Sequence, residues 1–185
     1  MIVTINNNRF ELVKGDITAQ DTEAIVNAAN GTLMGGGGVD GAIHRKAGFA
    51  LKEECLNIRK EVLHGAYLAT GEAVITKGYN LPANYVIHTV GPIWKGNKAD
   101  EEQLLTNCYQ NSLALASEKG IKSISFPSIS TGVFRFPIEL ASKIALGTII
   151  EFLETNSFGD VRFVLFSQQD FEVYESTLKN MLDFL

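Results

Sequence analysis

Short β-rich segments alternate with amphipathic helical segments along the whole chain, and this alternation constrains the fold more than any other feature of the sequence. Parallel strands need a long crossover between them, usually a helix. The alternation therefore predicts an α/β fold, with a mainly parallel sheet covered by helices on both faces. Asn6-Asn7-Asn8 is prone to turns and predicts an antiparallel hairpin at the N-terminus. The predicted strands cover residues 2–6, 10–13, 24–26, 73–76, 85–90, 123–126 and 161–166.

Three long helices are predicted where apolar residues recur every three or four positions. The first covers residues 101–119, and the second has Pro137 as its first helical residue. The third begins with Asp170 as its N-cap. Its apolar face comprises Tyr174, Leu178, Met181, Leu182 and Leu185. Because no linker-like segment or repeat separates these elements, residues 1–185 are expected to form a single domain.

Composition disfavours several classes of protein. The chain carries 16 Lys and Arg against 21 Asp and Glu, a net charge of −5, so nucleic acid is not expected as a partner. Cys55 and Cys108 fit no metal-ligand spacing and are expected to be reduced thiols on helices, and no metal site is expected. His44 and His88 are expected to be structural. Without a signal-peptide pattern or an apolar run of about 20 residues, we expect no membrane span and a cytoplasmic location.

The glycine run at residues 35–38 leads into a predicted helix start. Glycines let the backbone approach a ligand closely, and a helix N-terminus carries about half a positive charge, so this segment predicts a phosphate-binding loop. It is not a P-loop, because Ala42 and Ile43 stand where Lys and Ser or Thr would have to follow Gly41. Asp40 has two interpretations, a helix N-cap or a carboxylate that holds or deprotonates a water beside a ligand.

Further polar loops follow predicted strands, where open α/β sheets bind ligands. Asn27 and Asn30 lie just past a strand, and their amides can bind ribose hydroxyls or form Asx turns. The loop at residues 128–134 offers amides and hydroxyls for the other side of a diphosphate, with Phe134 against a sugar or ring. Asp16 can accept a hydrogen bond from an exocyclic amine such as that of adenine, or belong to a surface turn. Together these loops suit a diphosphate-linked nucleoside.

These segments together resemble the macro domain family. The glycine run and its flanking motifs are most similar to the MacroD-type branch, and within it to the bacterial O-acetyl-ADP-ribose deacetylases. The resemblance implies a three-layer α/β/α fold with a mixed, mostly parallel sheet of about six to seven strands. It covers essentially the whole chain, in family order, through residues 15–18, 24–30, 33–45, 70–73, 88–92 and 128–134.

The resemblance also implies a function and a site. The chain would bind ADP-ribose and hydrolyse an ester at its distal ribose, in O-acetyl-ADP-ribose or in mono-ADP-ribose attached to a protein carboxylate. Asp40 would accept a proton or position a water, and Asn30 would orient the ribose. No metal or cofactor is implied, and a monomer is expected. The implied substrate-binding residues are Asp16 and Ile17 for adenine, Gly38 and Val39 with Ser130, Thr131, Gly132, Val133 and Phe134 for the diphosphate, and Asn30, Asp40 and Phe134 for the distal ribose.

Two residues depart from the family pattern, and two rival functions stay open. Arg135 stands where related deacetylases commonly carry glycine, and its side chain can restrict the loop or reach a phosphate. Leu68 replaces a frequent cysteine and is expected to alter only packing. One rival is a reader module that binds ADP-ribose without hydrolysis, against which Asn30 and Asp40 together argue. The other is an RNA-binding protein using the aromatic and basic stretch 94–98, against which the net charge argues.

Overall fold

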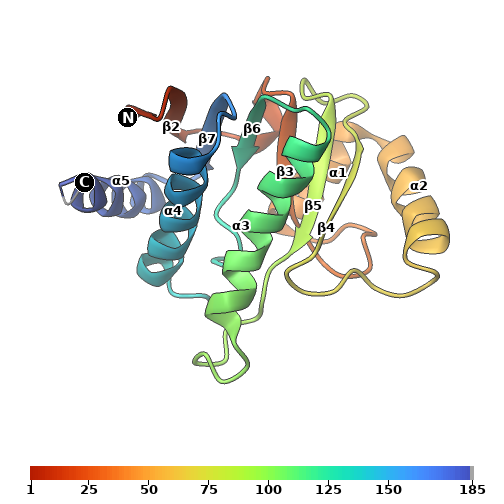
Figure 1. Ribbon diagram of the computed structural model, residues 1–185. Coiled ribbons are helices and arrows are strands. Elements are labelled where there is room, and N and C mark those ends of the chain that lie inside the picture. Colours follow the sequence, from red (N-terminus) through yellow and green to blue (C-terminus); the bar gives the residue numbers. More distant parts are fainter. Residues whose placement is uncertain (184–185) are drawn as a thin grey trace.

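The computed structural model describes residues 1–183, which form one mixed sheet with the strand order β1-β2-β7-β6-β3-β5-β4 (Figure 1). The two edge pairs, β1 with β2 and β4 with β5, are antiparallel, and all other neighbours are parallel. The strands are β1 (Ile2–Ile5), β2 (Asn8–Lys14), β3 (Ala24–Ala29), β4 (Ala73–Lys77), β5 (Tyr85–Val90), β6 (Ser123–Phe126) and β7 (Asp160–Leu165). The helical segments are η1 (Ile17–Ala19), α1 (Gly38–Ala47), α2 (Phe49–Asn57), η2 (Ile58–Val62), α3 (Glu101–Glu118), α4 (Ile138–Thr155) and α5 (Gln168–Leu182).

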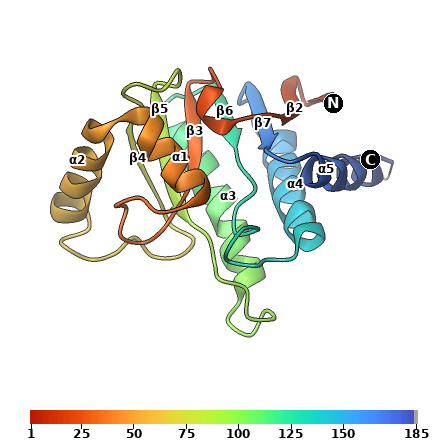
Figure 2. The same ribbon diagram turned by 180° about the vertical axis from the view of Figure 1, so that it is seen from behind.

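Helices cover both faces of the sheet, so the fold has the three α/β/α layers that the resemblance implied (Figures 1 and 2). α3, α4 and α5 pack on one face, and α1 and α2 pack on the other. Successive side chains of a strand point to opposite faces, and accordingly Val26 belongs to the core beneath α3 and α4 while Ile25 belongs to the core beneath α1 and α2. Within the described residues, no helix is long and apolar enough to cross a bilayer.

The predicted strands and the N-terminal hairpin are confirmed, with some ends displaced. Asn6 and Asn7 form the hairpin turn with φ of 47° and 65°, a conformation that asparagine tolerates better than most residues. β3 continues to Ala29 instead of ending at Val26. The expectation that Asn27 lies past the strand is therefore wrong, and its side chain is buried within the sheet. The hairpin was the only antiparallel element expected, but β4 also runs antiparallel to β5.

Two predicted helix starts are wrong, whereas the helix predicted over residues 101–119 is confirmed. Pro137 has an extended ψ of 126° and is the N-cap of α4, which begins at the next residue. The N-cap of α5 is Ser167, whose Oγ accepts a hydrogen bond from the Asp170 amide at 3.1 Å. Asp170 therefore lies in the first turn. Of the predicted apolar face, Tyr174 is buried and Leu185 lies outside the described residues.

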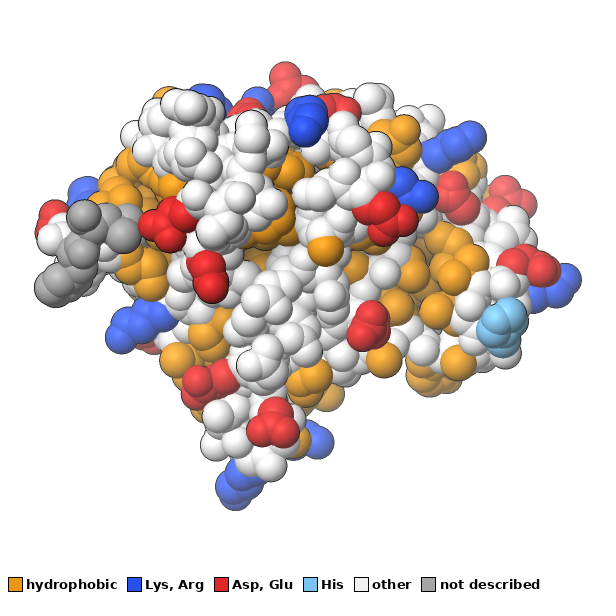
Figure 3. Space-filling view, in the orientation of Figure 1, with side chains coloured by type: hydrophobic (Ala, Val, Ile, Leu, Met, Phe, Trp, Pro, Cys, Tyr) orange, Lys and Arg blue, Asp and Glu red, His pale blue; other side chains and the backbone are white. Residues whose placement is uncertain are grey.

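The surface carries acidic and basic side chains interspersed, with no single basic face in the view of Figure 3. Trp94, the aromatic residue of the stretch that suggested RNA binding, is engaged within the fold. Its ring lies against that of Phe136, with the ring centroids 4.6 Å apart, and it is half-buried.

Candidate functional site

A cleft runs across the carboxyl ends of the parallel strands, which is where sheets of this kind bind ligands. It consists of two adjoining hollows of about 390 and 480 Å³. Four residues line both hollows: Gly38, Val39, Ser128 and Gly132. The first hollow also contains Asn30, Asp40, Ser130, Val133 and Phe134, and the second contains Asp16, Ile17 and Thr131. The structure thus brings together all the substrate-binding residues that the resemblance implied, whereas Asn27, whose amide the sequence also offered to a ribose, does not line the cleft.

The glycine run forms the wall between the sheet and α1. Gly37 is the N-cap of the helix, and the first backbone hydrogen bond within it is donated by Gly41 to the Gly37 carbonyl at 3.1 Å. The amides of Gly38 and Val39 therefore have no partner within the helix, and both residues line the cleft. Free amides at a helix N-terminus favour an anionic ligand, so this geometry suits a phosphate group.

Asp40 lies in the first turn of α1, and the interpretation that it caps the helix is wrong. Its side chain is buried, with 6% exposed. Its Oδ1 accepts a hydrogen bond from Asn27 Nδ2 at 2.8 Å and lies 3.5 Å from His44 Nε2. Its Oδ2 lies on the Gly36 side, since a Cβ added to Gly36 would be 3.3 Å from it. One carboxylate oxygen is thus held inside the protein while the other faces the wall of the first hollow.

Asn30 completes this end of the cleft. Its Oδ1 accepts a hydrogen bond from the Thr32 amide at 3.1 Å, which is the Asx turn that the sequence allowed. Its Nδ2 donates to the Gly35 carbonyl at 3.1 Å and would be 3.2 Å from a Cβ added to Gly36. The amide of Asn30 and the carboxylate of Asp40 therefore converge on Gly36.

Burial shifts the pKa values of both titratable groups at this end of the cleft, Asp40 and His44. Burial raises the pKa of Asp40, and the hydrogen bond from Asn27 and the charge of His44 act in the opposite direction. Burial lowers the pKa of His44, Asp40 raises it, and Lys52 lowers it further. At 3.5 Å the contact between Asp40 Oδ1 and His44 Nε2 falls short of a hydrogen bond, and it is an ion pair only when His44 is protonated. His44 was expected to be structural, but it lies beside the candidate catalytic carboxylate.

The loop opposite the glycine run is held from several sides. Its backbone is closed by hydrogen bonds from the Phe136 amide to the Ser130 carbonyl at 2.9 Å and from the Trp94 amide to the Phe134 carbonyl at 2.8 Å. Ser130 and Arg135 have φ of 67° and 60°. This left-handed conformation is why glycine fits at position 135, and here Arg135 adopts it with its side chain exposed.

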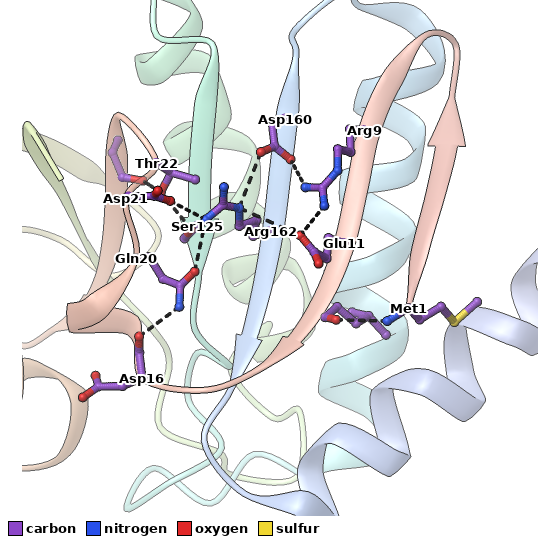
Figure 4. Close-up of polar contacts among 12 residues, drawn as sticks. Met1, Arg9, Glu11, Asp16, Gln20, Asp21, Thr22, Ser125, Asp160 and Arg162 are labelled. Atoms are coloured by element: carbon purple, nitrogen blue, oxygen red, sulfur yellow. Dashed lines mark hydrogen bonds and ion pairs between the residues drawn. The ribbon is translucent and has the colours of Figure 1, made fainter. Parts of the chain in front are cut away.

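The turn that carries Asp16 and Ile17 borders the second hollow and is anchored to the sheet. Asp16 Oδ1 accepts hydrogen bonds from the amide and the hydroxyl of Thr18, both at 2.8 Å, so Asp16 is the N-cap of η1 as well as a residue of the cleft. Gln20 Nε2 donates to the Asp16 carbonyl at 3.1 Å (Figure 4). Arg162 of β7 in turn donates to Gln20 Oε1 at 3.4 Å. The sequence offered two alternatives for Asp16, a surface turn or a residue of the ligand site. In the structure Asp16 lies in a turn and also lines the cleft.

Several residues of the cleft were not among those expected. Phe166 follows β7, lines the second hollow and has 83% of its side chain exposed, and Arg45 of α1 borders the same hollow. An aromatic residue at the end of a predicted strand was the available signal for Phe166. Gly91, from the loop after β5, lines the first hollow, and a Cβ there would overlap Ser130 Oγ. Among the described residues, no group of three His, Cys, Asp or Glu side chains is placed to hold a metal ion.

The fold and this cleft define an α/β domain with an anion-binding glycine loop facing a second polar loop, and a buried carboxylate at one end. Comparison with known proteins is specific. A model of the macro domain matches residues 26–145, and the chain belongs to the macro domain family.

Several similar proteins match this chain over nearly their whole length. The chain is 51% identical over 173 residues to the macro domain-containing protein TTE0995 of Caldanaerobacter subterraneus, covering 94% of this chain and 97% of that protein. It is also similar to the Oceanobacillus iheyensis macrodomain with ADP, with a TM-score of 0.98 and 52% identity, over 100% of this chain and 97% of the other. The G37V mutant of the same macrodomain, with ADPR, has a TM-score of 0.97 and 52% identity and covers 99% of this chain and 98% of the other.

Proposed function

We propose that the chain is a hydrolase that binds ADP-ribose and cleaves an ester at its distal ribose without a metal ion. The observation that carries the proposal is the convergence of Asn30 and the buried carboxylate of Asp40 on Gly36, at one end of a cleft made of two hollows of about 390 and 480 Å³. The substrates would be O-acetyl-ADP-ribose and mono-ADP-ribose on protein carboxylates. With this activity the chain would belong to the MacroD-type branch of the family.

Binding would use both hollows. Adenine would lie by Asp16 and Ile17, with the diphosphate between the free amides of Gly38 and Val39 and the opposite loop at residues 130–134. The distal ribose would then lie in the first hollow. Two neutral sets of amides and a helix N-terminus can bind a diphosphate even in a chain whose net charge is −5. The solved structures of a relative with ADP and with ADPR support this ligand.

The chemistry would be carried by Asp40 and a water. Oδ2 accepts a proton from the water, whose oxygen then bonds either to the ester carbonyl carbon or to the anomeric carbon. In the first case the bond between carbonyl carbon and ribose oxygen breaks, and Asp40 returns its proton to the ribose oxygen as the acid is released. In the second the bond between anomeric carbon and acyl oxygen breaks and releases a carboxylate, and Asp40 then gives its proton to solvent. Asn30 orients the ribose, and general-base assistance of this type typically contributes about 10²- to 10⁴-fold.

The test is the release of ADP-ribose from O-acetyl-ADP-ribose, followed by chromatography in the presence of a chelator. Asp40→Asn is the informative variant, because its amide oxygen can still accept the hydrogen bond from Asn27. We expect it to bind ADP-ribose and to lose roughly 10²-fold or more of the turnover. Undiminished turnover would exclude Asp40 as the base. A wild-type protein that binds ADP-ribose but releases nothing would be a reader module.

A further inference from the structure

A row of hydrogen bonds runs from Asp40 into the sheet and crosses three neighbouring strands. Asn27 of β3 donates from Nδ2 to Asp40 Oδ1 at 2.8 Å and contacts His88 Nδ1 of β5 at 3.1 Å. His88 Nε2 lies 2.9 Å from Thr76 Oγ1 of β4. Asn27 and His88 are directly opposite in the parallel pairing of their strands, and all three side chains are buried. None of them lines the cleft.

One set of proton positions satisfies every contact in this row. The Lys77 carbonyl can only accept, and the Thr76 hydroxyl, 3.1 Å away, donates its single proton there. Thr76 Oγ1 must then accept a proton from His88 Nε2. A neutral ring with its proton on Nε2 presents Nδ1 as an acceptor, which takes one N–H of Asn27. The second N–H of Asn27 is left for Asp40.

Two further facts show that Asn27 depends on this direction. Burial lowers the pKa of His88 to about 3, so the ring is neutral throughout an ordinary assay. Asn27 Oδ1 has no donor within hydrogen-bonding distance among residues 1–183. The orientation of the amide is therefore set only by the two acceptors that its NH₂ group faces. If the amide turned over, its oxygen would face the carboxylate and the ring lone pair together.

We propose that His88 and Thr76 are positioning residues for Asp40, because they hold the Asn27 amide with its NH₂ group toward Oδ1 and so leave Oδ2 as the oxygen that accepts the proton. The effect on turnover rests on the proposed function, whereas the arrangement of hydrogen bonds from Thr76 to Asp40 does not. The other titratable groups that face this row are His44 from α1 and Cys55 from α2, whose Sγ lies 4.0 Å from His88 Nε2. Burial raises the pKa of Cys55 to about 12, so it stays neutral.

Two substitutions at one position separate this role from simple packing. In His88→Asn, the side-chain oxygen can occupy the place of Nδ1 and accept from Asn27. In His88→Gln, the amide can reach Thr76 from the place of Nε2 but offers Asn27 no acceptor. Titration of the Asp40 carboxyl carbon by ¹³C NMR, assigned with Asp40→Asn, reports the result directly. We expect its pKa in His88→Gln to rise by about one unit, as for loss of one hydrogen bond to a carboxylate, and to rise little in His88→Asn.

Thr76→Ser and Thr76→Val repeat the comparison at the next residue, so the inference stays testable if one histidine variant fails to fold. Serine keeps the hydroxyl, and valine removes it and should raise the Asp40 pKa by a smaller amount. In turnover, the acid limb of the pH profile should move to higher pH in His88→Gln, with unchanged affinity for ADP-ribose. Equal Asp40 titrations in His88→Gln and His88→Asn would overturn the inference. If the titrations differ as expected but the wild type releases no ADP-ribose, the positioning of Asp40 by His88 and Thr76 is supported and the proposed hydrolase activity is refuted.

Discussion

Adding one methyl group at Gly36 should slow turnover with little effect on folding. A Cβ there would lie 3.2 Å from Asn30 Nδ2 and 3.3 Å from Asp40 Oδ2, so both groups would have to move by a few tenths of an ångström. Since a displacement of about 1 Å in a reacting geometry can cost about 10²-fold, we expect Gly36→Ala to lower kcat roughly three- to tenfold. Gly36 does not have a positive φ, so alanine fits its backbone. The unfolding free energy should change by less than about 1 kcal/mol.

The matched control is Gly147→Ala, in α4 and outside the cleft. The nearest atom to a Cβ at Gly147 would be Met181 Cε at 4.0 Å, so kcat should stay within about twofold of the wild type. The assay compares initial rates of ADP-ribose release by the two variants at saturating substrate, with Kd for ADP-ribose measured separately by calorimetry and Tm by thermal unfolding. Equal kcat values for the two variants would refute the assignment of Asn30 and Asp40 to the reacting end of the cleft.

Three further outcomes are expected. Arg135→Gly should raise Tm by about 2–3 °C in thermal unfolding, because it relieves a left-handed φ of 60° that costs an L-residue about 1 kcal/mol; a lower Tm would mean that the arginine side chain makes contacts of greater value. Phe166→Ala should lower the affinity for ADP-ribose roughly tenfold in calorimetry and leave Tm unchanged, since this exposed ring borders the half of the cleft proposed for adenine. A ligand without a base should bind the wild type and the variant equally. Turnover should fall as the pH decreases through an acid limb above the usual range of an aspartate, because burial raises the pKa of Asp40 and only its ionised form accepts a proton; a pH–rate profile with its acid limb at or below pH ~4 would contradict this.

The sequence was sufficient for the fold wherever local patterns and tertiary packing agree. The hairpin at Asn6 and Asn7 is an example, because the turn residues and the strand pattern on either side predict the same structure. The antiparallel pairing of β4 with β5 was missed although a signal was available. Only the residues between Lys77 and Tyr85 connect these strands, and so short a connection cannot make the crossover that a parallel pair needs.

The course of β3 was harder to predict for a physical reason. Asparagine is depleted in strands, so the β-rich pattern ends at Val26 and places Asn27 in a loop. In the structure, Asp40 and His88 lie against the buried NH₂ group of Asn27, and the strand continues past it. These partners come from segments remote in sequence, and no local pattern announces them. The same holds for His44, whose contact with Asp40 depends on where α1 begins.

The two carboxylate oxygens of Asp40 lie in different surroundings. Oδ2 lies toward Gly36 and the cleft, whereas Oδ1 is held by Asn27 and contacts His44 inside the protein. Substitutions in the buried row at Asn27, His88 and Thr76 should therefore alter the pKa of Asp40 and leave the affinity for the ligand intact. Substitutions at the other end of the cleft, such as at Phe166, should lower that affinity and leave the pKa of Asp40 intact. The buried row at Asn27, His88 and Thr76 reaches the carboxylate from three neighbouring strands, and its effect on turnover would follow from the proposed role of Asp40 as the base.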